Sequence, residues 1–179
     1  MLIDNEIKLD YKDVLIRPKR STLSSRKEVS LYREFSFRNY VPDFPDNIEK
    51  SHYCGVPIMA ANMDGVGTFK MAEELGRQAI FTCLAKTYSA EELIDFFGFS
   101  IDRRYVAMSI GTSQADFDKL VKVHAAVTDN LKYVCMDIAN GYSEHFAHHV
   151  RKVRDAFPHV VIIAGNVVTA DQTQELILN

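Results

Sequence analysis

The stretch GVPIMAANMD (residues 55–64) decides the fold class of this chain, because it opens a unit that recurs along the rest of the sequence. Each unit has an apolar run typical of a buried strand, polar residues where the run ends, and then an amphipathic, helix-like stretch. The later runs are AIFTCLAK (79–86), YVAMSIGTS (105–113), YVCMDIANG (133–141) and VVIIAGNVVT (160–169). The repeat predicts a parallel α/β sheet with its ligand site at the carboxyl ends of the strands.

The spacing of the runs matches one strand, one turn and one short helix. They begin near Val56, Ile80, Tyr105, Tyr133 and Val160, which gives offsets of 24, 25, 28 and 27 residues. Hydroxyl residues predict four helix starts. Three stand in capping-box patterns, Ser89 with Glu92, Ser113 with Asp116 and Thr169 with Gln172, and the fourth start is at Ser143. Helical spacing predicts two buried faces: Phe117, Leu120, Val121 and Val127, and then Phe146, Val150, Val153 and Phe157.

Two α/β architectures fit such a repeat. A five-stranded doubly wound sheet would be complete at 179 residues, whereas a (β/α)8 barrel needs about 250 residues, so this chain would hold about the first five barrel units. No Gly-rich nucleotide fingerprint follows any of the runs, which favours the barrel. We expect an N-terminal extension with strands and a loop (YVPDFPDNIEK) over residues 1–54, and a partial barrel over residues 55–179.

Composition argues against several classes of function. Hydrophobic residues make up 47% of the chain, enough for a core, and a net charge of −3 gives no basic field for nucleic acid. No apolar run reaches the roughly 18 residues that span a bilayer, and the N-terminus lacks the pattern of a secretory signal. We therefore expect a cytoplasmic protein that binds neither nucleic acid nor membrane.

Polar residues follow the strand runs, and these are the candidate site residues: Asn62, Met63, Asp64, Lys86, Asp137 and Asn166. The ends of parallel strands meet at one rim, so we expect a shared site there. Lys86 could hold a phosphate or a nicotinamide carboxamide, or lie exposed as a surface charge. Asp137 directly follows an apolar run, so its carboxylate needs a hydrogen-bond partner, which makes it the stronger candidate.

Histidine and cysteine positions give no metal or redox signature. His145, His148 and His149 have a spacing that can bind metal, but the apolar face of the same helix predicts that His145 and His149 lie on its flanks or outer surface. We interpret them as a solvated helix surface and expect no metal site. Cys54, Cys83 and Cys135 form no CxxC pair, and the last two are expected to be buried, unreactive thiols.

Four longer motifs carry a resemblance to a known family. They are KDVLIRPKRSTLSSR (12–26), GVPIMAANMDGVGTF (55–69), DIANGYSEHF (137–146) and AGNVVT (164–169). Together they closely resemble the IMP dehydrogenase/GMP reductase family, from about Lys8 to Asn179. The run NGYSEHF (140–146) and the lack of an inserted tandem domain after the second unit point to the reductases of that family.

The resemblance implies a (β/α)8 barrel, usually a homotetramer, that reduces GMP to IMP and ammonia with NADPH in purine nucleotide salvage. A cysteine of that family attacks the purine, which divides one difficult displacement into two easier steps. By motif match, Ser25 and Arg26 would meet the adenosine end of the cofactor from a neighbouring subunit. The residues expected beside the cofactor are Lys86, Asp137, Ile138 and Ala139, and those near the substrate are Asn62, Met63, Asp64 and Asn166.

The sequence also departs from the family pattern. The nucleophilic cysteine, the potassium ligands and the GMP phosphate site are expected beyond Asn179, so no catalytic residue is assigned within the chain. Ala85 and Thr87 stand where histidines normally flank Lys86, and Gly65 replaces a threonine. We therefore expect the 179-residue chain alone to be inactive. The alternatives are a truncated, non-catalytic fragment that binds nucleotide or other chains, an IMP dehydrogenase-like enzyme, and a complete doubly wound binding domain.

Overall fold

A computed structural model describes residues 7, 9–37, 52–99 and 103–179 of the chain. The chain divides into two compact units, Met1–Ser30 and Leu31–Asn179. The first unit contains two short 3₁₀ turns, Tyr11–Asp13 and Arg26–Glu28, and its described residues are exposed. The second unit holds the sheet and the helices. The expected loop YVPDFPDNIEK lies outside the described residues.

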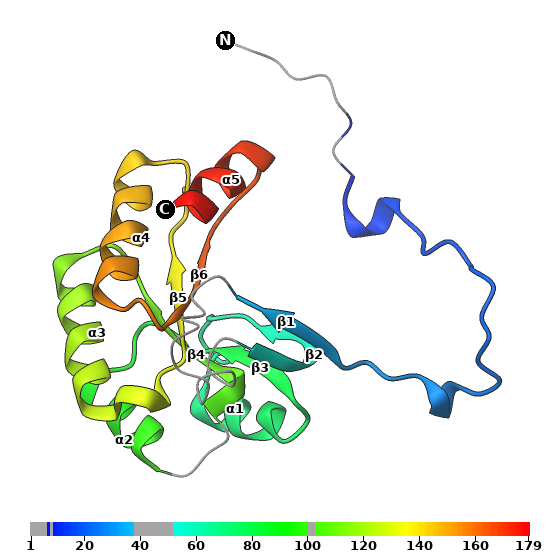
Figure 1. Ribbon diagram of the computed structural model, residues 1–179, viewed down its shortest axis with the longest axis horizontal. Helices are drawn as coiled ribbons and strands as arrows, with labels where there is room; N and C mark the ends of the chain where they lie inside the picture. Colours follow the sequence, from blue (N-terminus) through cyan, green and yellow to red (C-terminus); the bar gives the residue numbers. More distant parts are fainter. Residues whose placement is uncertain (1–6, 8, 38–51, 100–102) are drawn as a thin grey trace. The chain divides into compact units, whose positions relative to one another are not determined.

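The second unit follows the predicted alternation of strands and helices (Figure 1). Its elements are β1 (Arg33–Ser36), β2 (His52–Ala60), α1 (Phe69–Gly76), β3 (Ile80–Cys83), α2 (Ala90–Gly98), β4 (Val106–Ile110), α3 (Gln114–Val127), β5 (Tyr133–Asp137), α4 (Glu144–Ala156), β6 (Val161–Gly165) and α5 (Ala170–Leu178). All five expected β–α units form. The expected boundary between residues 54 and 55 falls inside β2, whose first half pairs with β1.

The strands lie side by side in the order in which they occur along the chain, from β1 to β6. The pair β1–β2 is antiparallel, and every later pair is parallel. A doubly wound sheet reverses its strand order at a switch point, where its ligand binds. The described strands contain no such reversal, so the doubly wound alternative is wrong and the sheet is singly wound.

The two faces of the sheet bury different kinds of side chain. One face packs against the helices through a cluster that includes Met108 and Met136 from the strands and Leu120, Phe146 and Val150 from the helices. The second cluster draws its buried members only from strands and the residues next to them: Tyr53, Ala79, Phe81, Cys83, Tyr105, Ala107, Tyr133, Cys135 and Val161. The helices therefore cover one face, and the other face packs on itself.

Side chains on the helix-free face meet across intervening strands. The rings of Phe81 on β3 and Tyr133 on β5 lie 4.9 Å apart between centroids, although β4 runs between them. In a flat sheet, two strand spacings would separate their backbones by about 10 Å. The rings converge because this face is concave. Burial raises the pKa of both Tyr53 and Tyr133 to about 12, so their hydroxyls stay protonated near neutral pH.

The helices begin where their caps predict. Ser89 and Glu92 form the reciprocal capping box, and the Ser113, Ser143 and Thr169 hydroxyls each accept from the third backbone N–H that follows. One predicted face needs correction, because Val121 is 43% exposed whereas Val123 is fully buried. Position 123 lies three residues after Leu120 and four before Val127, which places it on their stripe.

His149 is a second correction to the sequence prediction. It was expected on a flank or outer surface of α4, but it is buried and packs edge-on against the Phe117 ring of α3. Its Nε2 atom has no hydrogen-bond partner in the described part of the chain. Burial is the main cause that lowers the pKa of His149, and the nearby Lys152 and His145 lower it further.

Gly65, in the turn after β2, has a backbone φ of +76°, a conformation that side chains disfavour. A Cβ at this position would meet no atom within 4 Å, so backbone strain is the only cost of adding one. We expect Gly65→Ala to lower the free energy of unfolding by about 1 kcal/mol in chemical denaturation. The matched control is Gly98→Ala at the end of α2, which should leave stability unchanged or slightly higher, and an equal loss at both glycines would contradict the strain argument.

The buried His149 predicts a loss of stability in acid. The lowered pKa means that the unfolded chain binds a proton that the folded chain resists, so stability should decline as the pH falls below about 6.5, the ordinary histidine value. Denaturation midpoints measured from neutral to mildly acidic pH should show this decline, and His149→Gln should reduce it. The exposed neighbour variant His148→Gln should keep the wild-type pH dependence. If His149→Gln also kept it, the decline would have another origin.

Candidate functional site

The carboxyl ends of β2 and β5 are joined by one hydrogen bond. The Asn62 side-chain amide, just after β2, donates from Nδ2 to Oδ2 of Asp137 at 3.1 Å. Both side chains are half-buried, and they lie 75 residues apart in the sequence. Two other strands separate β2 from β5 in the sheet, so the curvature of the concave face makes this contact possible. The prediction that Asp137 needs a hydrogen-bond partner is thereby confirmed.

Hydrogen bonds join the loops after β5 and β6, beside the Asn62–Asp137 pair. Both the backbone N–H and the side-chain Nδ2 of Asn166 donate to the Ile138 carbonyl, each at 3.1 Å. The Ile138 N–H donates in turn to the Gly165 carbonyl at 2.9 Å. A Cβ on Gly141 would lie 2.2 Å from the Asn166 carbonyl oxygen, so only glycine fits there. Asn166 therefore has a fixed backbone position at the rim.

Gln172 is a positioning residue that the sequence argument missed. It was interpreted as the second half of a capping box with Thr169, but its Nε2 donates to the Asn166 carbonyl at 2.9 Å. Its Oε1 accepts from the Val168 N–H at 3.2 Å, and the residue is only 2% exposed. The side chain thus fills the turn after β6. A buried amide in the first turn of a helix was the only available signal, and the capping pattern explained it equally well.

Other predicted site residues lie at the strand ends without joining this network. Met63, Asp64, Lys86 and Ala139 are all exposed. Among the described residues, neither the Lys86 ammonium nor the Asp64 carboxylate has a hydrogen bond or ion pair, although the Lys86 carbonyl accepts from Lys119 Nζ at 2.8 Å. Their side chains remain available to a ligand.

Ser25 and Arg26 belong to the first compact unit. The Ser25 hydroxyl accepts from the Lys27 N–H at 3.2 Å and so caps a 3₁₀ turn, while Arg26 is exposed. Their expected contact with the adenosine end of a cofactor stays a prediction.

The thiols divide into one exposed and two buried cysteines. Cys54 is exposed, whereas Cys83 and Cys135 are buried on the concave face, as expected. The interaction between the two thiols is the main cause that raises the pKa of Cys83 and lowers that of Cys135. The described residues contain no cluster of three or more His, Cys, Asp or Glu side chains that could hold a metal ion. None of their helices is both long and apolar enough to cross a bilayer.

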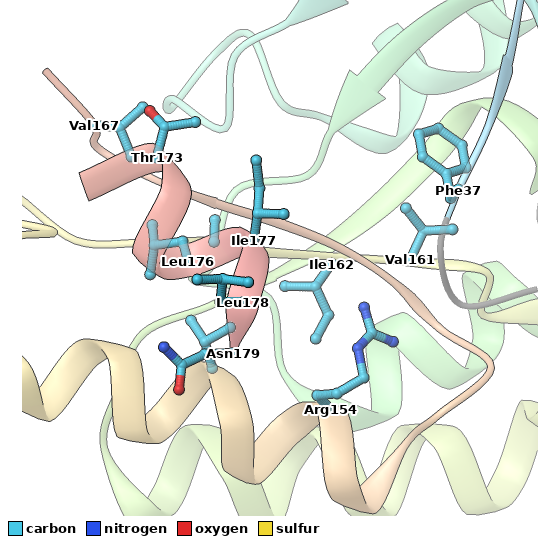
Figure 2. A pocket seen from close by; sticks show the side chains of 12 residues that line it. Phe37, Arg154, Val161, Ile162, Val167, Thr173, Leu176, Ile177, Leu178 and Asn179 are labelled. Carbon is cyan, nitrogen blue, oxygen red and sulfur yellow. The ribbon is translucent and has the colours of Figure 1, made fainter. Parts of the chain in front are cut away.

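A pocket of about 500 Å³ is lined by residues of α4, α5 and β6 and of the turn after β6. It is enclosed by α4, α5 and β6, as Figure 2 shows. Most of the residues that line the pocket are aliphatic. The Arg154 guanidinium, which also lines it, donates a hydrogen bond to the Val160 carbonyl at 2.7 Å. None of the predicted site residues lines it. We therefore assign the candidate site to the rim around Asn62 and Asp137.

Sequential parallel strands, helices on one face and polar side chains at the strand ends define an α/β protein with a rim site. The chain belongs to the IMP dehydrogenase/GMP reductase family, whose domain description matches residues 8–179. It is 51% identical to GMP reductase 2 of Homo sapiens over 178 residues, which cover 99% of this chain and 48% of that protein.

Two further comparisons agree. A GMP reductase of Onchocerca volvulus is 47% identical over 181 residues, covering 99% of this chain and 47% of that protein. The solved structure of inosine 5′-monophosphate dehydrogenase from Legionella pneumophila superposes with a TM-score of 0.71 at 20% identity, covering 92% of this chain and 46% of that one. The expected resemblance to GMP reductases is confirmed, and the chain spans about half the length of the curated relatives it matches.

The contact between Asn62 and Asp137 can be measured by a double-mutant cycle. Asn62→Ala and Asp137→Ala should each destabilise the chain, with a coupling energy of about 1 to 3 kcal/mol, because each change removes the same charged hydrogen bond. Chemical denaturation of the four forms gives the value. Asn62→Ala combined with Asp155→Ala, an exposed aspartate on α4, should be additive. Additivity at Asn62 and Asp137 would show that the contact contributes nothing in solution.

Proposed function

We propose that this chain forms part of a GMP reductase, which converts GMP to IMP and ammonia with NADPH in nucleotide salvage. The observation that carries the proposal is the 51% identity to human GMP reductase 2 over 99% of this chain. The rim supports it, because Asn62, Asp137 and Asn166 come together at the strand ends, where α/β proteins bind ligands. An IMP dehydrogenase-like activity is the second candidate, and the family as a whole allows it.

The sheet itself supports a larger assembly in the full-length protein. β6 is an edge strand of the described sheet, and the chain spans about half the length of its relatives. We propose that further β–α units continue from β6 and close a (β/α)8 barrel, with residues 1–54 as an extension. The nucleophilic cysteine and the potassium ligands would lie in those further units. The proposed assembly is a cytoplasmic homotetramer, in which Ser25 and Arg26 of one subunit serve the cofactor of another.

The residues at the rim fit NADPH chemically. Lys86 is exposed and its ammonium has no partner in the described residues, so its three donors remain for a carboxamide or phosphate oxygen. Asp137 uses one oxygen for Asn62, and the other is left to accept from a hydroxyl or an amide. Ile138 and the exposed Ala139 continue the same loop. NADPH, when bound, supplies the hydride.

The chain's own residues have the task of holding both ligands in register. Asn62 fixes the orientation of the Asp137 carboxylate, and the Ile138 and Gln172 contacts fix the backbone of Asn166. Met63 and Asp64 are exposed on the loop that carries Asn62, next to the proposed purine site. Fixed donors and acceptors of this kind accelerate a reaction by removing the need to orient them during it.

An assay of NADPH oxidation with GMP tests the proposal directly. We expect no turnover from the 179-residue chain, because the proposed nucleophile is outside it, and clear turnover from the protein extended to the length of its relatives. In the extended protein, Asp137→Asn should lower kcat/KM for NADPH by about tenfold or more, equivalent to about 1.4 kcal/mol.

The control is Asp155→Asn on the outer helix α4, which should retain full activity. Turnover by the short chain would overturn the proposed inactivity. Oxidation of IMP with NAD⁺ by the extended protein, without GMP reduction, would support the IMP dehydrogenase-like alternative. If the extended protein neither reduced GMP nor oxidised IMP, the result would favour the alternative of a non-catalytic binding protein.

A further inference from the structure

A basic run in the first compact unit has no part in the rim site. It reads RPKRSTL (17–23) and carries three cations, Arg17, Lys19 and Arg20, ahead of the hydroxyl residues Ser21 and Thr22. Every residue from 9 to 36 is exposed. The run therefore lies on the surface of its unit, where another enzyme can reach it.

The backbone of this run suits an extended binding groove. Residues 14–23 lie between the two 3₁₀ turns and belong to no helix or strand. Pro18 fixes its own φ and keeps the preceding Arg17 in an extended conformation. No backbone hydrogen bond joins residues 15–22 to another residue that the structure describes. An enzyme that takes up this segment therefore breaks no secondary structure.

The hydroxyl groups near the cations differ in whether the protein already uses them. The Ser21 hydroxyl accepts from the Leu23 N–H at 3.0 Å, and the Ser25 hydroxyl accepts from the Lys27 N–H at 3.2 Å. The Thr22 hydroxyl has no hydrogen-bond partner within the described part of the chain. It can therefore react without the loss of an existing contact.

The charges around Thr22 match the substrate pattern of one class of protein kinase. Kinases select a hydroxyl by the charge pattern of the peptide that carries it. Those with an acidic peptide groove favour cations two and three residues before the hydroxyl and an apolar residue directly after it. Thr22 has Arg20, Lys19 and Leu23 at these three positions. Ser24, by contrast, has hydroxyl residues at both cation positions.

We propose that Thr22 is a phosphorylation site for a serine/threonine protein kinase that prefers basic substrates. In this step Thr22 Oγ1 bonds to the γ-phosphorus of ATP, the bond from that phosphorus to the bridging oxygen breaks, and ADP leaves with the electron pair. The hydroxyl proton passes to a base of the kinase and then to solvent. The phosphothreonine carries about two negative charges near neutral pH.

The added charge has a consequence for cofactor binding, and this consequence rests on the proposed function. Ser25 and Arg26, three and four residues after Thr22, are proposed to meet the adenosine end of NADPH. That end carries the 2′-phosphate, so a phosphate on Thr22 repels it. In the extended protein, phosphorylation should raise KM for NADPH by about threefold or more and leave kcat unchanged. An unchanged KM would contradict this consequence but not the modification itself.

Incubation of the 179-residue chain with ATP, Mg²⁺ and the catalytic subunit of cAMP-dependent protein kinase tests the site. We expect one phosphate per chain, located at Thr22 by tandem mass spectrometry. Its rate of incorporation should lie within about threefold of the rate for a free peptide of residues 15–29, because the segment needs no unfolding. Thr22→Ala should abolish incorporation, and Thr22→Ser should retain it. Lys19→Gln combined with Arg20→Gln should lower kcat/KM of the kinase by about tenfold or more.

The matched control is Lys27→Gln, which removes an exposed cation on the other side of Thr22 and should leave the rate unchanged. Phosphate on Ser21 or Ser24 in place of Thr22, or no incorporation, would overturn the proposal. A chain that reacts more slowly than the peptide by a factor of about ten or more would also overturn it, because the segment would then be protected in solution. Incorporation of phosphate is measured without GMP reductase activity, so the two proposals stand or fall separately.

Discussion

The concave face of the sheet is the constraint on which the rest of the structure depends. Phe81 packs on Tyr133 past β4, and Tyr53 packs on Tyr105 past β3, which requires β2 to β5 to curl around these rings. A buried aromatic side chain contributes roughly 1.5 to 3 kcal/mol, whereas a single hydrogen bond contributes about 1 kcal/mol. The aromatic packing therefore sets the curvature. The hydrogen bond between Asn62 and Asp137 is a consequence of that curvature and not its cause.

The curved sheet gives the strand ends and the strand middles different chemistry. At the rim, loops bring amide and carboxylate groups into contact, and several exposed side chains remain free for a ligand. In the middle of the strands, the face holds aromatic, aliphatic and sulfur-containing side chains. β2 and β5 thus provide the hydrogen-bonded polar pair at the rim, whereas β3 and β5 each bury a cysteine lower on the same face.

Much of the fold could be predicted from the sequence because its signals are local. Apolar runs located the five strands of the repeat, hydroxyl caps located four of its five helices, and the motifs located the family. One error, Val121, concerns the buried stripe of its own helix, and the others concern contacts between elements. His149 was assigned to a flank or outer surface because only the stripe of its own helix was considered, and the approach of α3 buries it. Gln172 could not be recognised as a support for Asn166 because the turn after β6 brings them together. The pairing partner of Asp137 lay 75 residues away, which no local pattern encodes.

The close approach of Gly141 to the Asn166 carbonyl oxygen has a consequence for how this rim can change in evolution. The two loops share one small volume, so a larger residue at position 141 requires the following loop to take another path. Variation in one loop is therefore tolerated only when the other varies with it. The two loops therefore change as one unit, and a homologue that binds a different ligand at this rim must differ in both loops.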